Sequence, residues 1–495
     1  MSLAETGIAW WNGKEIAMRA LTWTGLIVLG SLLGTLGYAG EARGSGGSEL
    51  AGDSDEELGK APSRGLNSRT EFYAPAPDDA AVAQVRALLK ARDHSDAGKL
   101  TEMIDTPHAV WFTGGTPSEV TAAVRQTMAA AECGHRVPVL VAYNLPYRDC
   151  AQYSGGGAVD TTAYEAWIDG FARGIGKGKA VVILEPDGLG IIPYNTTING
   201  SADWCQPTVT DSSGNRIPAP GASSDERYVQ INFAVDSIES HAPHASLYLD
   251  SGHSAWLGVG EAAYRLTKAG VARAQGFFLN VSNYQLTSDS IQFGTWVSDA
   301  IAAPSGAPSW AFDSSGHFHF DWLPSQYDPA TNYTEVNYSP DYAATVTAGI
   351  QSFMGSAVAT THFVVDTSRN GQGPLQTAPY ALAPYNQSAA VISGLKSGNW
   401  CNPFGAGAGV LPSANTGVAL LDAYLWVKVP GESDGSCDIA GGARAWDYAA
   451  YNPWGVTGDA QNHFDPLWGM VDPSAGTWFA AQALQLAQNA NPTLR

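Results

Sequence analysis

The sequence predicts an α/β fold, most simply a barrel of parallel strands covered by helices. Short apolar runs rich in β-branched and aromatic residues recur along the chain, and stretches with helical spacing separate them. Strand and helix alternate at intervals of roughly 30 to 60 residues, which indicates parallel strands joined by crossover helices. With 495 residues, of which 44% are hydrophobic, the chain is long enough to bury the core that such a fold requires.

Residues 1–42 are expected to form a secretory signal peptide or a membrane anchor. An apolar run at 20–38 follows Arg19 and precedes small residues, which is typical of a signal peptide. The run is also close to the roughly 20 residues needed to span a bilayer, so an uncleaved anchor stays open as an alternative. Met18 is a candidate for the true start. Both interpretations place the bulk of the protein outside the cytoplasm.

Residues 43–71 are rich in Gly, Ser, Asp and Glu, and are expected to form a flexible acidic linker because they cannot bury apolar surface. The folded sequence is then expected to run from 72 to 495 as a single domain. No second linker interrupts it, so no separate binding module is expected in the chain.

Eight strands are expected within this domain. The runs at 137–143 and 180–184 are continuous and apolar, as strands buried on both faces require. Amphipathic patterns at 161–174 and 226–241 predict helices between strands. The eight expected strands are 109–112, 137–143, 180–184, 245–249, 276–281, 309–312, 362–365 and 424–428.

Five cysteines, none in a CxxC pattern, favour disulfides over a zinc site in an exported protein. Cys150 and Cys205 are 55 residues apart, and Cys401 and Cys437 are 36 residues apart. Each spacing suits a local bridge worth about 4 kcal/mol in the chain-entropy model. Cys133 would then remain free.

The charge balance argues against nucleic acid as a partner. The formal net charge is −21, and no local basic stripe is present to neutralise phosphates. Only 15% of the residues are charged, while the chain holds 16 Trp and 20 Tyr. This composition suits an uncharged ligand.

Acidic or amide side chains follow most of the expected strands. The carboxyl ends of parallel barrel strands meet at one mouth, where active sites lie, so several acids are expected to converge in one cleft. A single acid in this position is also a common helix N-cap, and it is the repetition that favours a site. The residues are Asp149, Asp187, Asp250, Asn280 or Asn283, Asp313, Asp366, and Lys428 with Glu432 and Asp434.

This arrangement points to acid chemistry on a sugar. In VVILEPD (181–187) a buried strand ends in two carboxylates, and both burial and like charge raise a carboxyl pKa. A carboxylic acid that keeps its proton at the working pH is what cleavage of a glycosidic bond requires. Trp111, Trp256 and Trp400 each lie beside a strand end or site loop, where an indole would stack on the apolar face of a sugar ring.

Six segments in order along residues 72–495 resemble glycoside hydrolase family 6, the inverting endoglucanases and cellobiohydrolases that cut β-1,4-glucan. They are YNLPYRDCAQYSGGGA (143–158), VVILEPDGLG (181–190), YLDSGHSAWLG (248–258), NVSNY (280–284), NWCNPFG (399–405) and WVKVPGESDG (426–435). The resemblance implies a catalytic domain folded as a distorted barrel with fewer than eight full strands. One of the eight expected strands is therefore peripheral.

By this resemblance Asp187 is the general acid, and Asp149 is the carboxylate that raises the pKa of Asp187 and relays protons. Asp434 is the proposed base, with proton removal through a water chain as the alternative. Tyr143 would press on the distorted sugar, and Ser154 would help to hold the attacking water. The resemblance also includes Arg148 in the catalytic loop, and implies substrate contacts at Trp111, Asp250, His253, Trp256, Asn283, Trp400, Lys428 and Glu432.

The resemblance agrees with the disulfides Cys150–Cys205 and Cys401–Cys437, and implies a monomer that acts on a glucan without cofactor or metal. Two positions depart from the family pattern, Tyr147 before Arg148 and Gly188 after Asp187, so the position of the loop and the surroundings of the acid are expected to differ. The segment 192–225 is also longer than in compact members.

Internal cutting through an open cleft is favoured, because the loop after Asp149 is short. The long segment 435–476, with Trp446, Tyr448, Trp454 and Trp468, could roof part of the cleft, so a cellobiohydrolase stays open as an alternative.

Two other classes of protein are considered. Retention of Asp149, Asp187 and Asp434 argues against a glucan-binding protein that has lost catalysis. His317 and His319, which share a face beside Asp313 and Asp321, prompt the alternative of a metal-dependent hydrolase. Two histidines without a matched third ligand are more often surface or substrate contacts.

Overall fold

The computed structural model describes residues 65–150, 152–327, 335–438 and 444–495. The expected signal peptide or anchor, and the linker as far as residue 64, lie outside this part of the chain. Within the described residues no helix is both long and apolar enough to cross a membrane.

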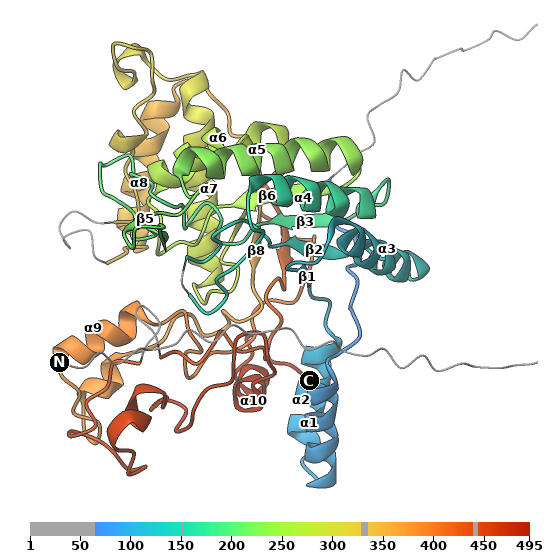
Figure 1. The fold of residues 1–495 in the computed structure, drawn as a ribbon, viewed down its shortest axis with the longest axis vertical. Helices are drawn as coiled ribbons and strands as arrows, with labels where there is room; N and C mark the ends of the chain where they lie inside the picture. The colour runs from blue at the N-terminus through green and yellow to red at the C-terminus, as the bar shows by residue number, and fades with distance from the viewer. Residues whose placement is uncertain (1–64, 151, 328–334, 439–443) are drawn as a thin grey trace, which may run out of the picture. The chain divides into compact units, whose positions relative to one another are not determined.

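A curled sheet of seven parallel strands forms the centre of the molecule (Figure 1), and the order of the strands in the sheet follows the order along the chain. The Ala109 N–H donates to Trp426 O at 2.9 Å, so the first strand meets the segment that follows the last one. This backbone hydrogen bond stands where a closed barrel would have a full set of hydrogen bonds between its first and last strands, so the barrel is distorted. The strands are β1 (Val110–Phe112), β2 (Val139–Ala142), β3 (Val181–Leu184), β6 (Ser246–Asp250), β7 (Gly276–Leu279), β8 (His362–Asp366) and β9 (Leu421–Leu425).

Helices cover the outside of the sheet, and α3, α4 and α5 lie side by side (Figure 1). The expected helices at 161–174 and 226–241 are confirmed as α4 and α5. The helices are α1 (Asp79–Lys90), α2 (His94–Asp105), α3 (Pro117–Cys133), α4 (Thr161–Ile175), α5 (Ser224–His241), α6 (Val259–Lys268), α7 (Thr287–Ala302), α8 (Pro340–Met354), α9 (Ala389–Ser397) and α10 (Ala480–Gln488). In the long segment 192–225, an exposed hairpin is formed by β4 (Thr208–Thr210) and β5 (Arg216–Pro218).

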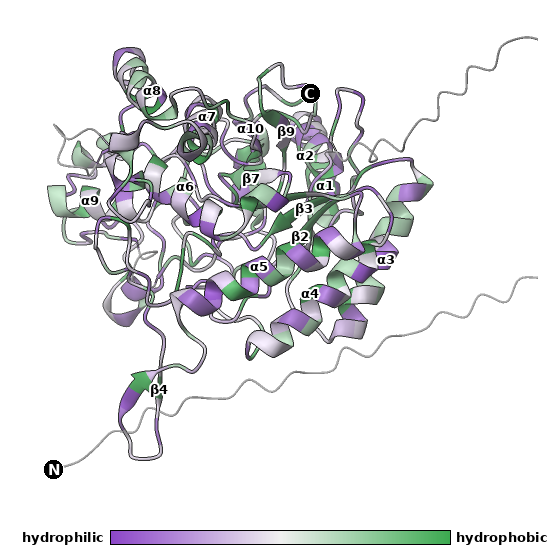
Figure 2. Ribbon diagram, turned by 90° about the horizontal axis from the view of Figure 1, so that it is seen from above, coloured by the Kyte–Doolittle hydropathy of each residue, from purple (hydrophilic) through white to green (hydrophobic). Residues whose placement is uncertain are grey.

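β2, β3 and β7 are hydrophobic along their length (Figure 2), and every residue in these three strands is buried. Alternate side chains point outward to the helices, for example Leu140 and Val182, or inward to fill the barrel, for example Val141 and Ile183. This two-sided burial explains why the strands are continuous hydrophobic runs in the sequence.

Two strand predictions need correction. The expected strand at 309–312 is instead a short 3-10 helix, Ser309–Ala311, and it leads into a hairpin outside the sheet. Trp310 packs on Phe353, and Phe312 packs on Phe318 across the hairpin, rather than between strands of the sheet. The last strand is Leu421–Leu425, three residues earlier than the expected 424–428. The chain leaves the sheet there because the N–H groups of Val427 and Lys428 donate to the Asp366 carboxylate.

Candidate active site

The loops after β2 and β3 lie next to each other and carry Asp149 and Asp187. Asp149 is buried, and the hydroxyls of Tyr143 and Ser154 both donate to one of its carboxylate oxygens. The other oxygen of Asp149 is buried without a hydrogen-bond partner. Cys150, the next residue, is joined to Cys205 by a disulfide that fastens this loop.

The backbone of these two loops is strained. Tyr147, Asp149, Cys150, Glu185 and Asp187 all have a φ between 30° and 62°, a region that residues other than glycine seldom occupy. Such strain persists only where the surrounding structure enforces it, and it gathers at functional sites. Its occurrence on both sides of the Asp149–Asp187 pair supports a site here.

Asp187 is half-buried and follows the end of β3. Burial raises the pKa of its carboxyl well above the ordinary value, and the charges of Asp149 and Asp250 raise the pKa further. Burial also raises the pKa of Asp149, but the bonds from Ser154 and Tyr143 and the charge of Arg148 oppose that shift. These donors favour the ionised form of Asp149, so the pKa of Asp187 is the more strongly raised of the two.

Glu185 and Arg227 brace the two acidic loops, and neither was singled out from the sequence. Glu185 is buried and accepts hydrogen bonds from the N–H groups of Asn144 at 2.8 Å and Leu145 at 3.1 Å. Burial raises the pKa of Glu185 to about 7. The only sequence signal was the position of Glu185 in VVILEPD, two residues before the acid.

Arg227 enters from α5 and is almost fully buried. Its guanidinium donates to Gly188 O at 2.6 Å, Ile191 O at 2.9 Å and Pro146 O at 3.0 Å. These carbonyls belong to the loops on both sides of the acid pair, so Arg227 holds the two loops together. An arginine on the buried face of a predicted helix was the signal that could have found it.

The two departures from the family pattern have local explanations. A Cβ on residue 188 would lie 2.7 Å from Glu185 O, so only glycine fits after the acid without a backbone shift. The hydroxyl of Tyr147 donates to Pro220 O at 2.8 Å, which ties the Asp149 loop to the long segment 192–225.

Asp250 and Asp366 stand at strand ends, as expected, and both hold backbone N–H groups. Asp250 accepts from Leu189 at 3.0 Å, Gly190 at 2.9 Å and Gly252 at 3.0 Å. Asp366 accepts from four N–H groups, those of Ser282, Ser368, Val427 and Lys428. Each carboxylate therefore positions loops at the mouth of the barrel. The expectation that Asp313 also lies at a strand end is wrong, because it occupies the outer hairpin.

Asp434 is held by four hydrogen bonds from three residues. The buried Arg369 guanidinium donates at 2.9 and 3.0 Å to its two oxygens, and the Tyr284 hydroxyl and the Asn402 N–H each donate at 3.0 Å. These donors reach both carboxylate oxygens, so the orientation of the Asp434 side chain is fixed.

The Asn402 side chain joins Asp434 to Gly435 and Asp472 by hydrogen bonds, and the sequence did not point to it. Its side-chain oxygen accepts from the Asp434 N–H at 2.9 Å, and its amide nitrogen donates to Gly435 O at 2.9 Å and to Asp472 at 3.0 Å. Burial and the charge of Asp465 raise the pKa of Asp472 to about 8. Asp465, Asp472 and Cys437 also bring donor atoms within 4.8 Å of one another. The Cys437 sulfur is bonded to Cys401, so it is not available as a thiolate ligand.

The remaining expected residues lie in several places around these loops. The rings of Trp111 and Tyr143 meet edge to face at 5.3 Å, and Arg148 lies 4.4 Å over the Tyr143 ring. His253 packs against Trp256 with ring centroids 5.6 Å apart, and burial lowers the pKa of His253 to about 3, so this imidazole is neutral.

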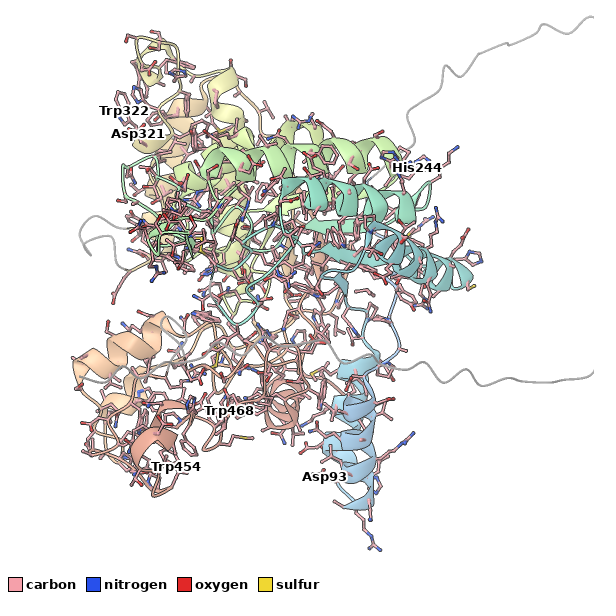
Figure 3. The ribbon with its side chains drawn as sticks, in the orientation of Figure 1. Asp93, His244, Asp321, Trp322, Trp454 and Trp468 are labelled. Carbon is pink, nitrogen blue, oxygen red and sulfur yellow. A yellow bond between two sulfur atoms is a disulfide. The ribbon has the colours of Figure 1, made fainter. Side chains whose placement is uncertain are left out.

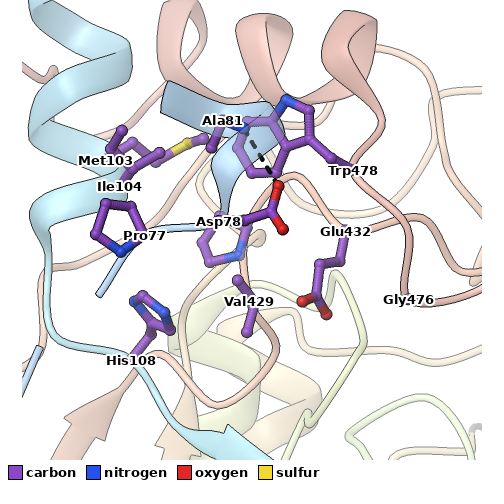
Figure 4. Close-up of a pocket in the computed structure, with 11 residues that line it drawn as sticks. Pro77, Asp78, Ala81, Met103, Ile104, His108, Val429, Glu432, Gly476 and Trp478 are labelled. Carbon is purple, nitrogen blue, oxygen red and sulfur yellow. Dashed lines mark hydrogen bonds between the residues drawn. The ribbon is translucent and has the colours of Figure 1, made fainter. Parts of the chain in front are cut away.

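The other residues expected to contact the substrate lie on several different loops. Trp400 packs against Tyr153 at 6.2 Å, and Asn283 is half-buried in the turn after β7. Lys428 pairs with Glu432 at 3.7 Å. Glu432 lines a small cavity of about 40 Å³ with residues that include Asp78, His108 and Trp478 (Figure 4), and no other expected site residue lines it.

A carboxyl of strongly raised pKa beside a second carboxylate, at the mouth of a parallel barrel with nearby indoles, is the arrangement expected of a glycoside hydrolase. The chain belongs to the glycosyl hydrolases family 6, whose sequence profile matches residues 67–490. Endoglucanase 1 of Streptomyces halstedii is 31% identical over 378 residues, which cover 76% of this chain and 85% of that protein. The 1,4-β-D-glucan cellobiohydrolase C of Emericella nidulans is 27% identical over 445 residues, covering 85% of this chain and 76% of that protein.

Among solved structures, the endoglucanase Cel6 from Mycobacterium tuberculosis is similar to this chain, with a TM-score of 0.52 and 28% identity. The match covers 85% of this chain and 97% of that one. That structure holds methyl-cellobiosyl-4-deoxy-4-thio-β-D-cellobioside, a cello-oligosaccharide analogue.

Proposed function

We propose that the protein is a secreted cellulase that hydrolyses β-1,4-glucosidic bonds inside glucan chains, by single displacement with inversion. The observation that carries the reaction is the carboxyl pair, in which Asp149 and burial keep the proton on Asp187. Asp187 donates this proton to the leaving glycosidic oxygen as the bond breaks. Water attacks from the opposite face of the sugar, which inverts the anomeric centre.

Tyr143, Ser154 and Arg148 support this step from the Asp149 loop. The Tyr143 and Ser154 hydroxyls hold the Asp149 carboxylate, and the Arg148 guanidinium covers the Tyr143 ring. Tyr143 presses on the sugar at the cleavage point, and Ser154 helps to hold the attacking water. Asp434 orients that water, and the proton leaves through a water chain rather than by direct transfer, because Arg369 occupies both oxygens of Asp434.

Replacement of the acid tests the reaction. Asp187→Ala should reduce the rate of cellotetraose hydrolysis by at least about 10²-fold, because general acid catalysis contributes about 10² to 10⁴-fold. Asp341→Ala, which removes an exposed carboxylate in the first turn of α8, is the control and should leave the rate unchanged. An unchanged rate in Asp187→Ala would show that another group supplies the proton. A wild-type protein that binds cellotetraose without cleaving it would instead be a glucan-binding protein.

Internal cutting is supported by the similarity to enzymes named endoglucanases and by the short loop after Asp149. A cellobiohydrolase is the second candidate, because one contact joins the loop that carries Asp149 to the segment after Asp434. The Tyr153 hydroxyl donates to Asp438 at 3.1 Å, and the Tyr153 ring packs on Trp400. A bridge of this kind would hinder entry of a chain from the side.

Viscosity measurements on carboxymethyl cellulose separate these two candidates. An endoglucanase lowers the viscosity rapidly for each reducing end released, whereas a roofed enzyme barely lowers it. Tyr153→Ala should increase the fall in viscosity for each reducing end released only if Tyr153 closes the cleft. A small fall with the wild-type enzyme and a larger one with this variant would therefore favour the cellobiohydrolase.

Secretion and a monomeric state are part of the proposal. The disulfides Cys150–Cys205 and Cys401–Cys437 suit an oxidising compartment outside the cytoplasm. Recovery of the enzyme from the culture medium, together with its mass by light scattering, tests both points.

A further inference from the structure

A hairpin outside the catalytic barrel presents two indoles to solvent. Trp310 is 51% exposed and Trp322 is 50% exposed. We call the surface formed by Trp310, Trp322 and the side chains between them the outer aromatic surface. Figure 3 shows Trp322 and Asp321 at the edge of the molecule, far from Trp454 and Trp468.

The backbone brings the two tryptophans to the same end of this hairpin. Phe312 and Phe318 form an antiparallel bridge, and the His319 N–H donates to Ala311 O at 2.9 Å. In this register, residue 310 lies close to the short helix Phe320–Trp322. The two exposed indoles therefore come from neighbouring parts of one hairpin.

Each indole is fixed by packing. Trp310 meets the buried Phe353 edge to face, with ring centroids 4.9 Å apart. Trp322 stacks flat on His319 at 3.7 Å with an interplanar angle of 2°, so one face of the indole is covered and the other is left outward. Rings already held in place lose little conformational entropy when a ligand binds.

Polar pairs alternate with the rings. His317 contacts Asp313 at 3.2 Å, and His319 contacts Asp321 at 3.2 Å, so the two imidazoles belong to two separate pairs. The centre of a protein interface is depleted of charged residues, which argues against a protein partner on this surface. A sugar chain fits both features, because its C–H faces stack on indoles and its hydroxyls bond to carboxylates and imidazoles.

The hairpin is also braced against the loop that carries His253 and Trp256. A Cβ on Gly260 would lie 2.0 Å from Phe320 O, so the hairpin backbone touches the start of α6. The Gln326 amide donates to Leu257 O at 2.8 Å, and the Tyr327 hydroxyl donates to Trp256 O at 2.7 Å. The outer aromatic surface thus belongs to the same rigid unit as the Trp256 platform.

We propose that the outer aromatic surface is a second glucan-binding site, which holds a β-1,4-glucan chain outside the catalytic cleft. The ligand class rests on the proposed function. The substrate is a polymer, so one molecule can occupy the cleft and this surface together, and such double attachment increases retention on an insoluble glucan.

The test compares binding with hydrolysis for the full chain. Trp310→Ala/Trp322→Ala should lower the partition of the enzyme onto microcrystalline cellulose at 4 °C at least fivefold, and leave the rate of cellotetraose hydrolysis within twofold of wild type. Trp310→Phe/Trp322→Phe keeps aromatic faces and should retain most of the binding. Leu382→Ala removes another side chain that is 66% exposed, and should change neither quantity.

The outcomes separate this proposal from the proposed function. Unchanged partition of the alanine variant, or an equal loss of cellotetraose hydrolysis, would overturn the second site. A wild-type dimer that the alanine variant dissociates would also overturn it, by assigning the surface to self-association. Failure of the wild-type protein to cleave cellotetraose would refute the proposed function, while the cellulose partition would still report on this surface.

Discussion

Replacement of Arg227 by methionine should both destabilise the protein and disable its site. Methionine keeps most of the aliphatic volume of the side chain but removes three hydrogen bonds to Gly188 O, Ile191 O and Pro146 O. Hydrogen bonds to a charged group contribute about 1.5–3 kcal/mol each, which gives an upper bound near 9 kcal/mol for three of them. Removal of one partner from a buried pair of charges typically costs about 3–5 kcal/mol, because the other charge, here that of Glu185, is left uncompensated. We therefore expect Arg227→Met to lower the free energy of unfolding by about 3–5 kcal/mol.

Equilibrium unfolding in urea, followed by tryptophan fluorescence, measures this loss. Arg273→Met is the matched control, because Arg273 also contacts α5, through an exposed pair with Asp236 at 2.8 Å. Exposed pairs contribute about 0–1 kcal/mol, so the control should lie within that range. In the Arg227 variant, kcat should also fall by a larger factor than KM rises, because the loops that carry Asp149 and Asp187 are released. A variant within 1 kcal/mol of wild type, with unchanged kcat, would refute the bracing role of Arg227.

Three further predictions concern the carboxylates. Asp149→Asn removes the like charge that raises the pKa of Asp187, so the alkaline limb of the kcat/KM profile should move to lower pH; an unmoved limb would contradict the assignment. Asn402→Ala should lower kcat about 10²-fold with little change in KM, because it removes the acceptor of the Asp434 N–H and so releases the backbone that carries this carboxylate; a loss of unfolding free energy with unchanged kcat would point to a merely structural role. The pKa of Asp472 rises from 3.8 in the unfolded chain to about 8 in the folded protein. Between these two pH values the folded protein holds a proton that the unfolded chain releases, so the unfolding free energy falls progressively as the pH rises. Asp472→Asn should flatten the decline in unfolding free energy from pH 4 to pH 8, and a decline as steep as in wild type would exclude that pKa.

The sequence predicts correctly those strands in which every residue is buried. β2 and β3 are uninterrupted apolar runs, and Asp149 and Asp187 follow them at the carboxyl edge of the sheet, where geometry brings strand ends together. The aromatic run at 309–312 has the composition of a strand, but Phe312, Phe318 and Phe353 pack on one another in a hairpin of their own. Composition does not distinguish a sheet core from such a satellite cluster.

The supporting residues of the site were beyond sequence reasoning for a different reason. Each of these residues bonds to partners that lie far away along the chain and become neighbours only on folding. Arg227 donates to Gly188 O, 39 residues away, and Asn402 donates to Asp472, 70 residues away. Asp250 and Asp366 illustrate the reverse case. Both were expected in the mouth of the barrel and both lie there, yet their oxygens are taken up by backbone N–H groups.

The stereochemistry of the first product tests the central claim most directly. Proton NMR during cellotetraose hydrolysis, recorded before mutarotation, should show the new reducing end as the α-anomer, because water attacks opposite the bond that Asp187 protonates. A β-anomer would contradict single displacement and the roles assigned to Asp187 and Asp434.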